Sequence, residues 1–323
     1  MLGILRQMPR PRPVAFARAS CLPMLAWCRR TASTRRIHRE AAVGFSGETP
    51  SVYERSRPGY PTEAIRAIEA EILRCRDGGV GAKVSERKDR SGALVDLGCG
   101  TGKFTRQILP FAETHGFPMV GIEPIESMRD KFKSVLPGVT VMEGTGESIS
   151  MPDASAQAVI ASQSFHWMAS LATLREVHRV LAPGGPLILV WNILDMTNPW
   201  ISAHEEIITP LYEGGVPYHK TGQWRLMFDH VEGSGSSGEE PRLLGNLTEM
   251  FFPHSQRLTL DELEGRTRSL SVVSSRPESA QVDIIRRVQE LAGTHPDTQD
   301  DLARDGKVEL VYNTEVYWCH KSL

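Results

Sequence analysis

The stretch Leu94–Thr105 reads LVDLGCGTGKFT, and its order of apolar residues and glycines decides the fold class. The apolar run Ala93–Leu97 predicts a short buried strand, Gly98–Gly102 a turn, and Lys103 the approximate start of a helix. Pro110 should kink or end that helix early, because proline lacks the backbone N–H. A glycine turn between the first strand and helix of an open α/β sheet is where nucleotides bind.

The same strand–turn–helix pattern repeats along the chain. Strands are expected at Pro118–Ile122, Val139–Met142, Ala158–Ser162 and Leu187–Trp191, and helices at Thr62–Arg76, Glu126–Val135 and Leu171–Ala182. Strands alternating with helices at this spacing predict a parallel sheet with helices on both faces.

The pattern loosens after residue 192. Residues 193–230 mix aromatic residues with glycine and proline, which suits a lid, and residues 232–242 read as a polar, flexible loop. A capping box between Thr259 and Glu262 starts a helix at about Leu260. Further elements are expected as strands at Met250–Phe252, Gln256–Thr259 and Lys307–Cys319 and as a helix at Ser279–Leu291.

The composition is that of a folded globular protein. Of 323 residues, 40% are apolar and 24% charged, and no apolar run is long enough to predict a membrane-spanning helix. The five cysteines include no CxxC pair, so the sequence indicates neither a zinc site nor a disulfide framework, and no metal is expected. Scattered cysteines fit a reducing compartment.

The near-neutral charge averages a basic leader and an acidic body. Residues 1–39 hold nine arginines and no acidic residue; removing them from 37 basic residues leaves 28 against 39 acidic, a net charge of −11. We expect residues 1–40 to stand apart from a domain at 41–323. An Arg-rich, acid-free leader suits a mitochondrial transit peptide, while a disordered tail or a misassigned start codon would leave the protein cytoplasmic.

The residues around the glycine turn indicate which nucleotide it binds. Glycines alone would suit a dinucleotide equally well, but Gly98, Gly100 and Gly102 do not have the spacing of the dinucleotide fingerprint. Asp96 precedes the turn, where a carboxylate would repel a pyrophosphate and attract an amine. Glu123 ends the second strand, where a carboxylate can accept hydrogen bonds from a ribose diol. A nucleoside with a cationic tail is therefore expected, and S-adenosylmethionine meets both requirements.

These segments resemble the class I S-adenosylmethionine-dependent methyltransferases. VDLGCGTG is similar to their first motif, VGIEP to their second-strand acid motif, and LAPGGPLILVWN to their late turn and strand, together covering residues 90–192. The resemblance implies a Rossmann-like α/β fold: a mostly parallel seven-stranded sheet with helices on both faces and a small cap.

A narrower resemblance points to small-molecule methyltransferases related to trans-aconitate methyltransferase. It is carried by YERSRPGYP at 53–61, GTGESISMPDASAQAVIASQSFHWM at 144–168, SLS at 269–271 and the ending VYNTEVYWCHK. Two departures occur: Gly146 stands where alanine is usual, and Gln157 where aspartate is usual. The cap is expected at 45–62 and 193–250.

The resemblance implies a set of site residues. Asp96 is expected to receive the methionine amine, directly or through water, and Glu123 the ribose, while Met128, Gly146 and Glu147 are expected near the adenine. Structural alternatives remain for each, such as a helix cap for Asp96. The full cofactor set is Asp96, Gly98, Cys99, Gly100, Gly102, Glu123, Pro124, Met128, Gly146, Glu147 and Gln163, and the acceptor set is Tyr53, Arg57, Tyr60, His166 and Trp167.

The expected reaction is O-methylation of a small carboxylic acid or hydroxyl compound. A carboxylate needs no general base, whereas a hydroxyl would, with His166 as the candidate. Alternatives are C- or O-methylation of a lipid-like or secondary metabolite, and a cofactor-binding accessory protein without catalysis. The acidic body argues against a nucleic-acid partner. A monomer or a dimer is expected.

Overall fold

The computed structural model describes residues 38–45, 49–76, 92–229 and 243–322. Residues 1–37, most of the basic leader, lie outside the described part of the chain. The polar loop predicted at 232–242 also lies outside it. Helix α1 (Arg39–Gly44) begins inside the range assigned to the leader, with His38 as its N-terminal cap.

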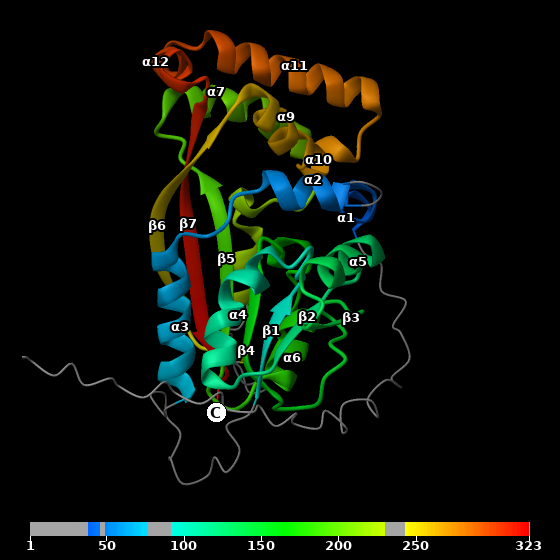
Figure 1. The fold of residues 1–323 in the computed structure, drawn as a ribbon. Helices are drawn as coiled ribbons and strands as arrows, with labels where there is room; N and C mark the ends of the chain where they lie inside the picture. Colours follow the sequence, from blue (N-terminus) through cyan, green and yellow to red (C-terminus); the bar gives the residue numbers. More distant parts are fainter. Residues whose placement is uncertain (1–37, 46–48, 77–91, 230–242, 323) are drawn as a thin grey trace, which may run out of the picture. The chain divides into compact units, whose positions relative to one another are not determined.

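Seven strands form one sheet in the order β3-β2-β1-β4-β5-β7-β6 (Figure 1). Strands β1 to β5 pair in parallel, whereas β7 is antiparallel to β5, and β6 to β7. The bounds are β1 Ala93–Leu97, β2 Met119–Ile122, β3 Thr140–Met142, β4 Ala156–Ser162, β5 Pro186–Leu194, β6 Thr248–Leu258 and β7 Val308–His320. The predicted fold class is confirmed, and the chain order reverses direction across the sheet between β1 and β4.

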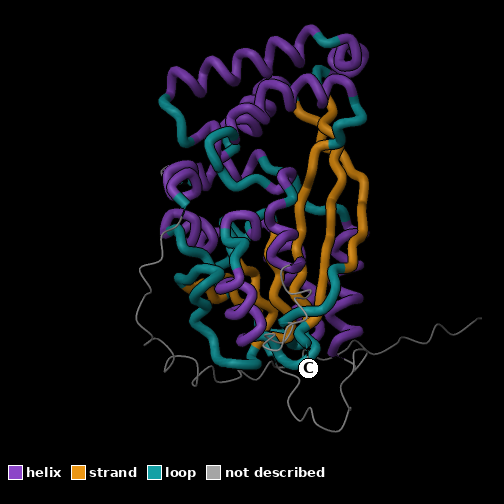
Figure 2. The backbone as a smooth tube through the Cα atoms, turned by 180° about the vertical axis from the view of Figure 1, so that it is seen from behind, coloured by secondary structure: helices purple, strands orange, loops and turns teal. Residues whose placement is uncertain are grey.

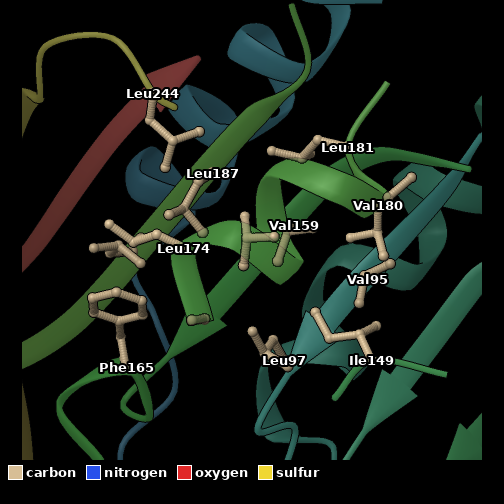
Figure 3. Close-up of a cluster of buried hydrophobic side chains, with 14 of the residues drawn as sticks. Val95, Leu97, Ile149, Val159, Phe165, Leu174, Val180, Leu181, Leu187 and Leu244 are labelled. Atoms are coloured by element: carbon tan, nitrogen blue, oxygen red, sulfur yellow. The ribbon is translucent and has the colours of Figure 1, made fainter. Parts of the chain in front are cut away.

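Helices cover both faces of the sheet (Figures 1 and 2). Apolar side chains of α3 (Thr62–Arg76) and α4 (Lys103–His115) pack on one face, and those of α6 (Leu171–Val180) on the other. Figure 3 shows the second cluster, where Leu174 of α6 meets Val159 and Leu187 of neighbouring strands. Helix α5 (Glu126–Val135) packs beside β3 and places Phe132 against the glycine turn.

A third apolar cluster lies where β5, β6 and β7 extend past the shorter strands (Figures 1 and 2). It joins those strands to the C-terminal helices and to α7. The helices in question are α7 Pro199–Ile208, α9 Leu260–Arg268, α10 Ser271–Ser274, α11 Glu278–Thr294 and α12 Pro296–Asp305, while the short α8 spans Leu226–Asp229. Helix α2 (Thr49–Ser56) packs on α9, so this helix lies beside the C-terminal helices.

The prediction that Pro110 would end its helix early is wrong, because α4 continues to His115. A proline removes the hydrogen bond to the carbonyl four residues earlier, here that of Arg106. Arg106 and Pro110 are both exposed, so this side of the helix faces water, which can bind the freed carbonyl. The opposite side buries Ile108 and Phe111 in the core and holds the helix in place.

Other predicted elements were found with altered lengths. The capping box is present, since Thr259 and Glu262 exchange hydrogen bonds at the start of α9. The two strands expected between 250 and 259 form one strand, β6, and α7 and α12 were not predicted. Within the described residues, no helix combines the length and the apolar character that crossing a membrane requires.

Candidate functional site

A cavity of about 830 Å³ opens at the carboxyl ends of β1, β2, β4 and β5. This edge includes the point between β1 and β4 where the strand order reverses, the usual ligand site of open α/β sheets. Most of the predicted site residues line the cavity: Tyr53, Arg57, Tyr60, Gly98, Cys99, Gly100, Glu123, Pro124, Met128, Gly146, Glu147, Gln163, His166 and Trp167.

The glycine turn after β1 lies between the β4 end and the cavity. Gly98 has a φ of +73°, and a Cβ there would lie 2.6 Å from that of Ser164, whose hydroxyl donates to the Leu97 carbonyl at 2.7 Å. Gly100 has a φ of +54°, and a Cβ there would have no atom within 4 Å. The turn thus packs tightly on its protein side and presents bare backbone to the cavity, so a ligand can approach closely.

Glu123 follows β2 and is held by backbone groups. One carboxylate oxygen accepts from the Gly100 N–H and the other from the Ile125 N–H, both at 2.9 Å. Burial raises the pKa of Glu123 to about 7, although these two hydrogen bonds oppose the shift. Because a carboxylate oxygen can accept more than one hydrogen bond, both oxygens keep acceptor capacity for a ligand.

Asp96 and Gly102 do not line the cavity but support its wall. Asp96 is fully buried; one oxygen accepts from the Thr105 hydroxyl at 2.6 Å, while the other has no hydrogen-bond partner in the described structure. Burial raises the pKa of Asp96 to about 7, and nearby Glu123 adds to the rise. Gly102 begins α4 and approaches Phe132, so its position is set by packing.

Gln163 sits directly after β4 in an unusual backbone conformation. Its φ is +55°, a backbone angle that residues other than glycine rarely adopt. The backbone N–H donates to the Val190 carbonyl at 2.8 Å, and the side-chain amide to that of Asn192 at 3.3 Å. Such strain is typical of functional sites held by their surroundings.

Gly146, where alanine is usual in the resembling proteins, has a structural explanation. A Cβ at this position would lie 2.7 Å from the Met168 sulfur and 2.8 Å from the Thr173 side chain. Neighbouring Glu147 accepts from the Ser170 hydroxyl at 2.9 Å, and Ser170 also caps α6. Glycine at 146 therefore accommodates Met168, which lines the cavity.

Two arginines line the opposite end of the cavity. The Arg57 guanidinium donates to the Ser269 carbonyl at 3.0 Å and lies 5.2 Å from the Tyr53 ring centroid, and its Nε is buried without a partner. Arg266 is 8% exposed and donates to the Tyr312 hydroxyl at 3.2 Å. Across the described residues, neither arginine forms an ion pair with a carboxylate. Burial, and then the charge of Arg266, lower the pKa of Arg57 to about 10.

A small hollow of about 100 Å³ adjoins this end and shares Arg57, Gln163, His166 and Arg266 with the main cavity. Its remaining cation, Lys220, is paired with Glu205 at 2.7 Å. Lys220 therefore has a carboxylate in direct contact, whereas the described residues place none in contact with the two arginines.

His166 is fixed by the indole of Trp191, which donates to His166 Nδ1 at 3.2 Å. Because an indole N–H can only donate, Nδ1 is an acceptor, and the proton of the neutral ring resides on Nε2. Burial lowers the pKa of His166 to about 3, and electrostatic interactions with His219 and Arg57 act in the same direction. The ring is therefore neutral at pH 7, with Nε2 as an N–H donor.

Helix α2 is tied to the glycine turn by polar contacts. Glu54 accepts from the Thr101 hydroxyl at 2.6 Å and pairs with Arg106 at 2.8 Å. Tyr60, after α2, packs edge-on against Phe104 with ring centroids 5.4 Å apart. These contacts hold α2 and the residues after it in a position where Tyr53 and Arg57 line the cavity.

The sequence analysis did not predict Arg266, Trp191 or Asn192 as site residues. One signal was available: Arg266 follows buried Leu263 by three residues, so it lies on the apolar side of an amphipathic helix. A charged residue on that side indicates a partner elsewhere in the fold.

Comparisons with known proteins find a methyltransferase domain and methyltransferase-like relatives. Residues 95–189 match a model of the methyltransferase domain. An uncharacterized methyltransferase-like protein of Schizosaccharomyces pombe is 29% identical over 269 residues, 83% of this chain and 92% of that protein. An uncharacterized methyltransferase of Mycobacterium bovis is 29% identical over 283 residues, 85% and 95% of the two chains.

A solved structure supports the fold. A putative methyltransferase from an antibiotic biosynthesis pathway of Anabaena variabilis superposes with a TM-score of 0.51 at 15% identity, covering 84% of this chain and all of that one. The glycine turn, the strand-end carboxylates and these matches have one common explanation. Residues 95–189 carry a methyltransferase domain, and the chain is an S-adenosylmethionine-dependent methyltransferase with a Rossmann-like α/β fold.

Proposed function

We propose that this enzyme methylates a carboxylate oxygen of a small organic acid. The observation that carries the proposal is the pair Arg57 and Arg266, which line the cavity and lack a carboxylate partner among the described residues. A buried guanidinium without a counter-charge is costly, and a bound carboxylate would supply that charge through paired N–H donors. An apolar, lipid-like acceptor would leave both guanidinium groups without a carboxylate in contact.

The cofactor end of the cavity fits S-adenosylmethionine by its chemistry. Glu123 would hold the ribose hydroxyls with the acceptor capacity left on its oxygens. The unpartnered, buried oxygen of Asp96 would receive the methionine amine through water, because Asp96 lies behind the cavity wall. Gly98 and Gly100 would allow the close approach, and Met128, Pro124, Gly146 and Glu147 would flank the adenine.

Cys99 and Gln163 complete the proposed cofactor set as parts of the wall, and Gly102 supports the turn through its packing. When bound, S-adenosylmethionine supplies an activated methyl group. The task of the protein is then to align the acceptor, which can lower a barrier by roughly 7–11 kcal/mol. Arg57 and Arg266 would fix one carboxylate, with Tyr53, Tyr60 and Trp167 excluding water around it.

His166 contributes a hydrogen-bond donor in this proposal. Its Nδ1 is occupied by Trp191, so the Nε2–H is the group left for the acceptor. A carboxylate acceptor is already ionised at pH 7 and needs no general base. A ring with a pKa of about 3 is also a poor base for a hydroxyl acceptor, which favours the carboxylate version.

A panel of small mono-, di- and tricarboxylic acids tests the proposal, with methyl esters detected by mass spectrometry. We expect a methyl ester from at least one acid. Arg266→Gln should lower kcat/KM for that acid by about 100-fold, since a charge-assisted hydrogen bond contributes roughly 1.5–3 kcal/mol. Arg268→Gln is the matched control, because Arg268 lies on the same helix and pairs with Glu264 and Glu278.

Cofactor affinity, measured by calorimetry, should be the same in Arg266→Gln and Arg268→Gln. No ester from any acid, or equal turnover in the two variants, would refute the carboxylate assignment and leave the methyltransferase identity intact.

A further inference from the structure

A second cluster of reactive side chains lies at the opposite edge of the sheet from the cavity. Glu71 and Cys75 follow each other at one-turn spacing on α3, and His320 is the last residue of β7. His320 pairs with Pro186 at the start of β5, whereas the cavity lies beyond the other end of that strand. Because Glu71 and His320 are 249 residues apart, no spacing in the sequence indicated this cluster.

The Glu71 carboxylate is the centre of the cluster. One of its oxygens lies 2.5 Å from His320 Nε2 and 3.2 Å from the Cys75 sulfur, and the three atoms lie within 4.8 Å of one another. Glu71 is 8% exposed and Cys75 1%, so the atoms are held in a packed environment. Hydrogen bonds from His320, Arg74 and Cys75 outweigh burial and lower the pKa of Glu71 to about 2, which keeps it ionised.

We propose that Glu71, Cys75 and His320 form a binding site for a divalent transition metal of the zinc class. Carboxylate, thiolate and imidazole are the three ligand types that Zn²⁺ takes in proteins, at about 2.0–2.3 Å from the ion. Tetrahedral ligands then lie about 3.3–3.8 Å apart. The observed separations come within about an ångström of these values, so small side-chain movements would suffice.

Metal binding requires a defined exchange of protons and partners. The Cys75 thiol releases its proton to solvent, and the His320 ring proton that Nε2 donates to Glu71 in this structure moves to Nδ1 through solvent, so that Nε2 can coordinate the ion. Arg74, which now pairs with Glu71 at 2.6 Å, must turn away; its side chain is 44% exposed, so it can move into water. Water fills the fourth position, on the side that Arg74 leaves.

The metal would join α3, near the beginning of the domain, to the last strand. It would lie apart from the cavity, so its presence does not depend on the acceptor or on the proposed function. We therefore expect a contribution to folding stability rather than to the methyl transfer.

Cobalt titration of the full chain, stripped of metal by a chelator, tests the site. One equivalent of Co²⁺ should produce a thiolate-to-metal charge-transfer band and visible bands of tetrahedral intensity. Cys75→Ser should remove the charge-transfer band, and His320→Gln should weaken binding by about tenfold or more. Cys319→Ala is the matched control, because Cys319 is equally buried but belongs to the cluster on the other face of the sheet.

Arg74→Gln provides an independent check, because removing the competing cation should tighten Co²⁺ binding, whereas a purely structural ion-pair network would still bind no metal. Zn²⁺ should displace Co²⁺ and raise the Tm of the wild type but not of Cys75→Ser. The proposal is overturned if the wild type shows no thiolate band, or if that band persists in Cys75→Ser, which would assign it to other cysteines such as Cys21 and Cys28.

Discussion

The two ends of the cavity have opposite electrostatic character. The cofactor end is built on Glu123 and, behind the wall, Asp96, and burial raises both carboxyl pKa values to about 7. The proposed acceptor end is the part of the cavity lined by Arg57 and Arg266. A cationic cofactor and an anionic acceptor would thus each meet the opposite charge. This difference in charge would set the order in which the two ligands lie along the cavity.

The ends also differ in how they are built. The cofactor end comes from consecutive strand ends of the sheet, within residues 96–163. The proposed acceptor end joins residues of α2 and Arg57, just after it, to residues of α9 and β7 that lie more than 200 positions later in the sequence. The first end therefore depends on local turn geometry, and the second on packing of the surrounding helices.

The largest effect is expected from Gly98→Ala at the cofactor end. The added Cβ would lie 2.6 Å from Ser164 at a φ of +73°, so the turn must shift. We expect cofactor affinity, measured by calorimetry, to fall about 100-fold, roughly 2.7 kcal/mol. Gly116→Ala is the control: its φ is +72°, but no atom lies within 4 Å of its Cβ, so only stability should fall. Equal affinities would contradict the comparison.

A pH series separates the ends by charge. The folded-state pKa values of about 7 for Asp96 and Glu123 exceed their ordinary values of 3.8 and 4.5. These groups therefore favour folding at low pH, and that contribution is lost as pH rises through 7. A cationic ligand favours their ionised forms, so cofactor affinity should rise about tenfold from pH 6 to 8.

Proton release on binding accompanies this rise and can be measured by calorimetry in buffers of different ionisation enthalpy. Asp96→Asn should release fewer protons than the wild type. An affinity that stays constant over this range would show that the carboxylates do not meet the cationic tail.

Trp191→Phe tests the acceptor end through a positioning residue. Loss of the indole N–H lets the proton of His166 move to Nδ1, so fewer molecules present Nε2–H. We expect kcat to fall about fivefold, with cofactor affinity unchanged. This change corresponds to the free energy that one neutral hydrogen bond contributes. Nitrogen NMR of His166 should report the change of tautomer. Trp318→Phe, on β7 and outside the cavity, should alter neither reading.

The smallest effect is expected from Gly146→Ala. The new Cβ would lie 2.7 Å from the flexible Met168 sulfur, which can move aside, and 2.8 Å from the buried Thr173 side chain, which must shift slightly, so cofactor affinity should fall only about threefold. The double variant with Met168→Ala should recover part of the loss, measured as a double-mutant cycle. Independent, additive effects would show that the two side chains do not share this space.

Much of the fold was predictable because its signals are local. The bounds of α3, α5 and β1 agree with the predicted ranges, since each has its own apolar periodicity and stop signal. The prediction failed for Pro110 because a freed carbonyl facing water costs little when the other side of the helix is buried. It missed α12, Pro296–Asp305, because only Thr298 is buried there, which leaves no apolar periodicity to detect.

The sequence by itself predicted the proposed cofactor end. Asp96 lies in β1, and the glycines and Glu123 follow the ends of β1 and β2, so their order along the chain indicates the chemistry. Only the tertiary structure brought Arg57 to Arg266, oriented His166 through Trp191, and placed His320 beside Glu71 and Cys75. The physical reason is that helix packing and antiparallel strand pairing join distant segments, and a single sequence carries no local signal of such contacts.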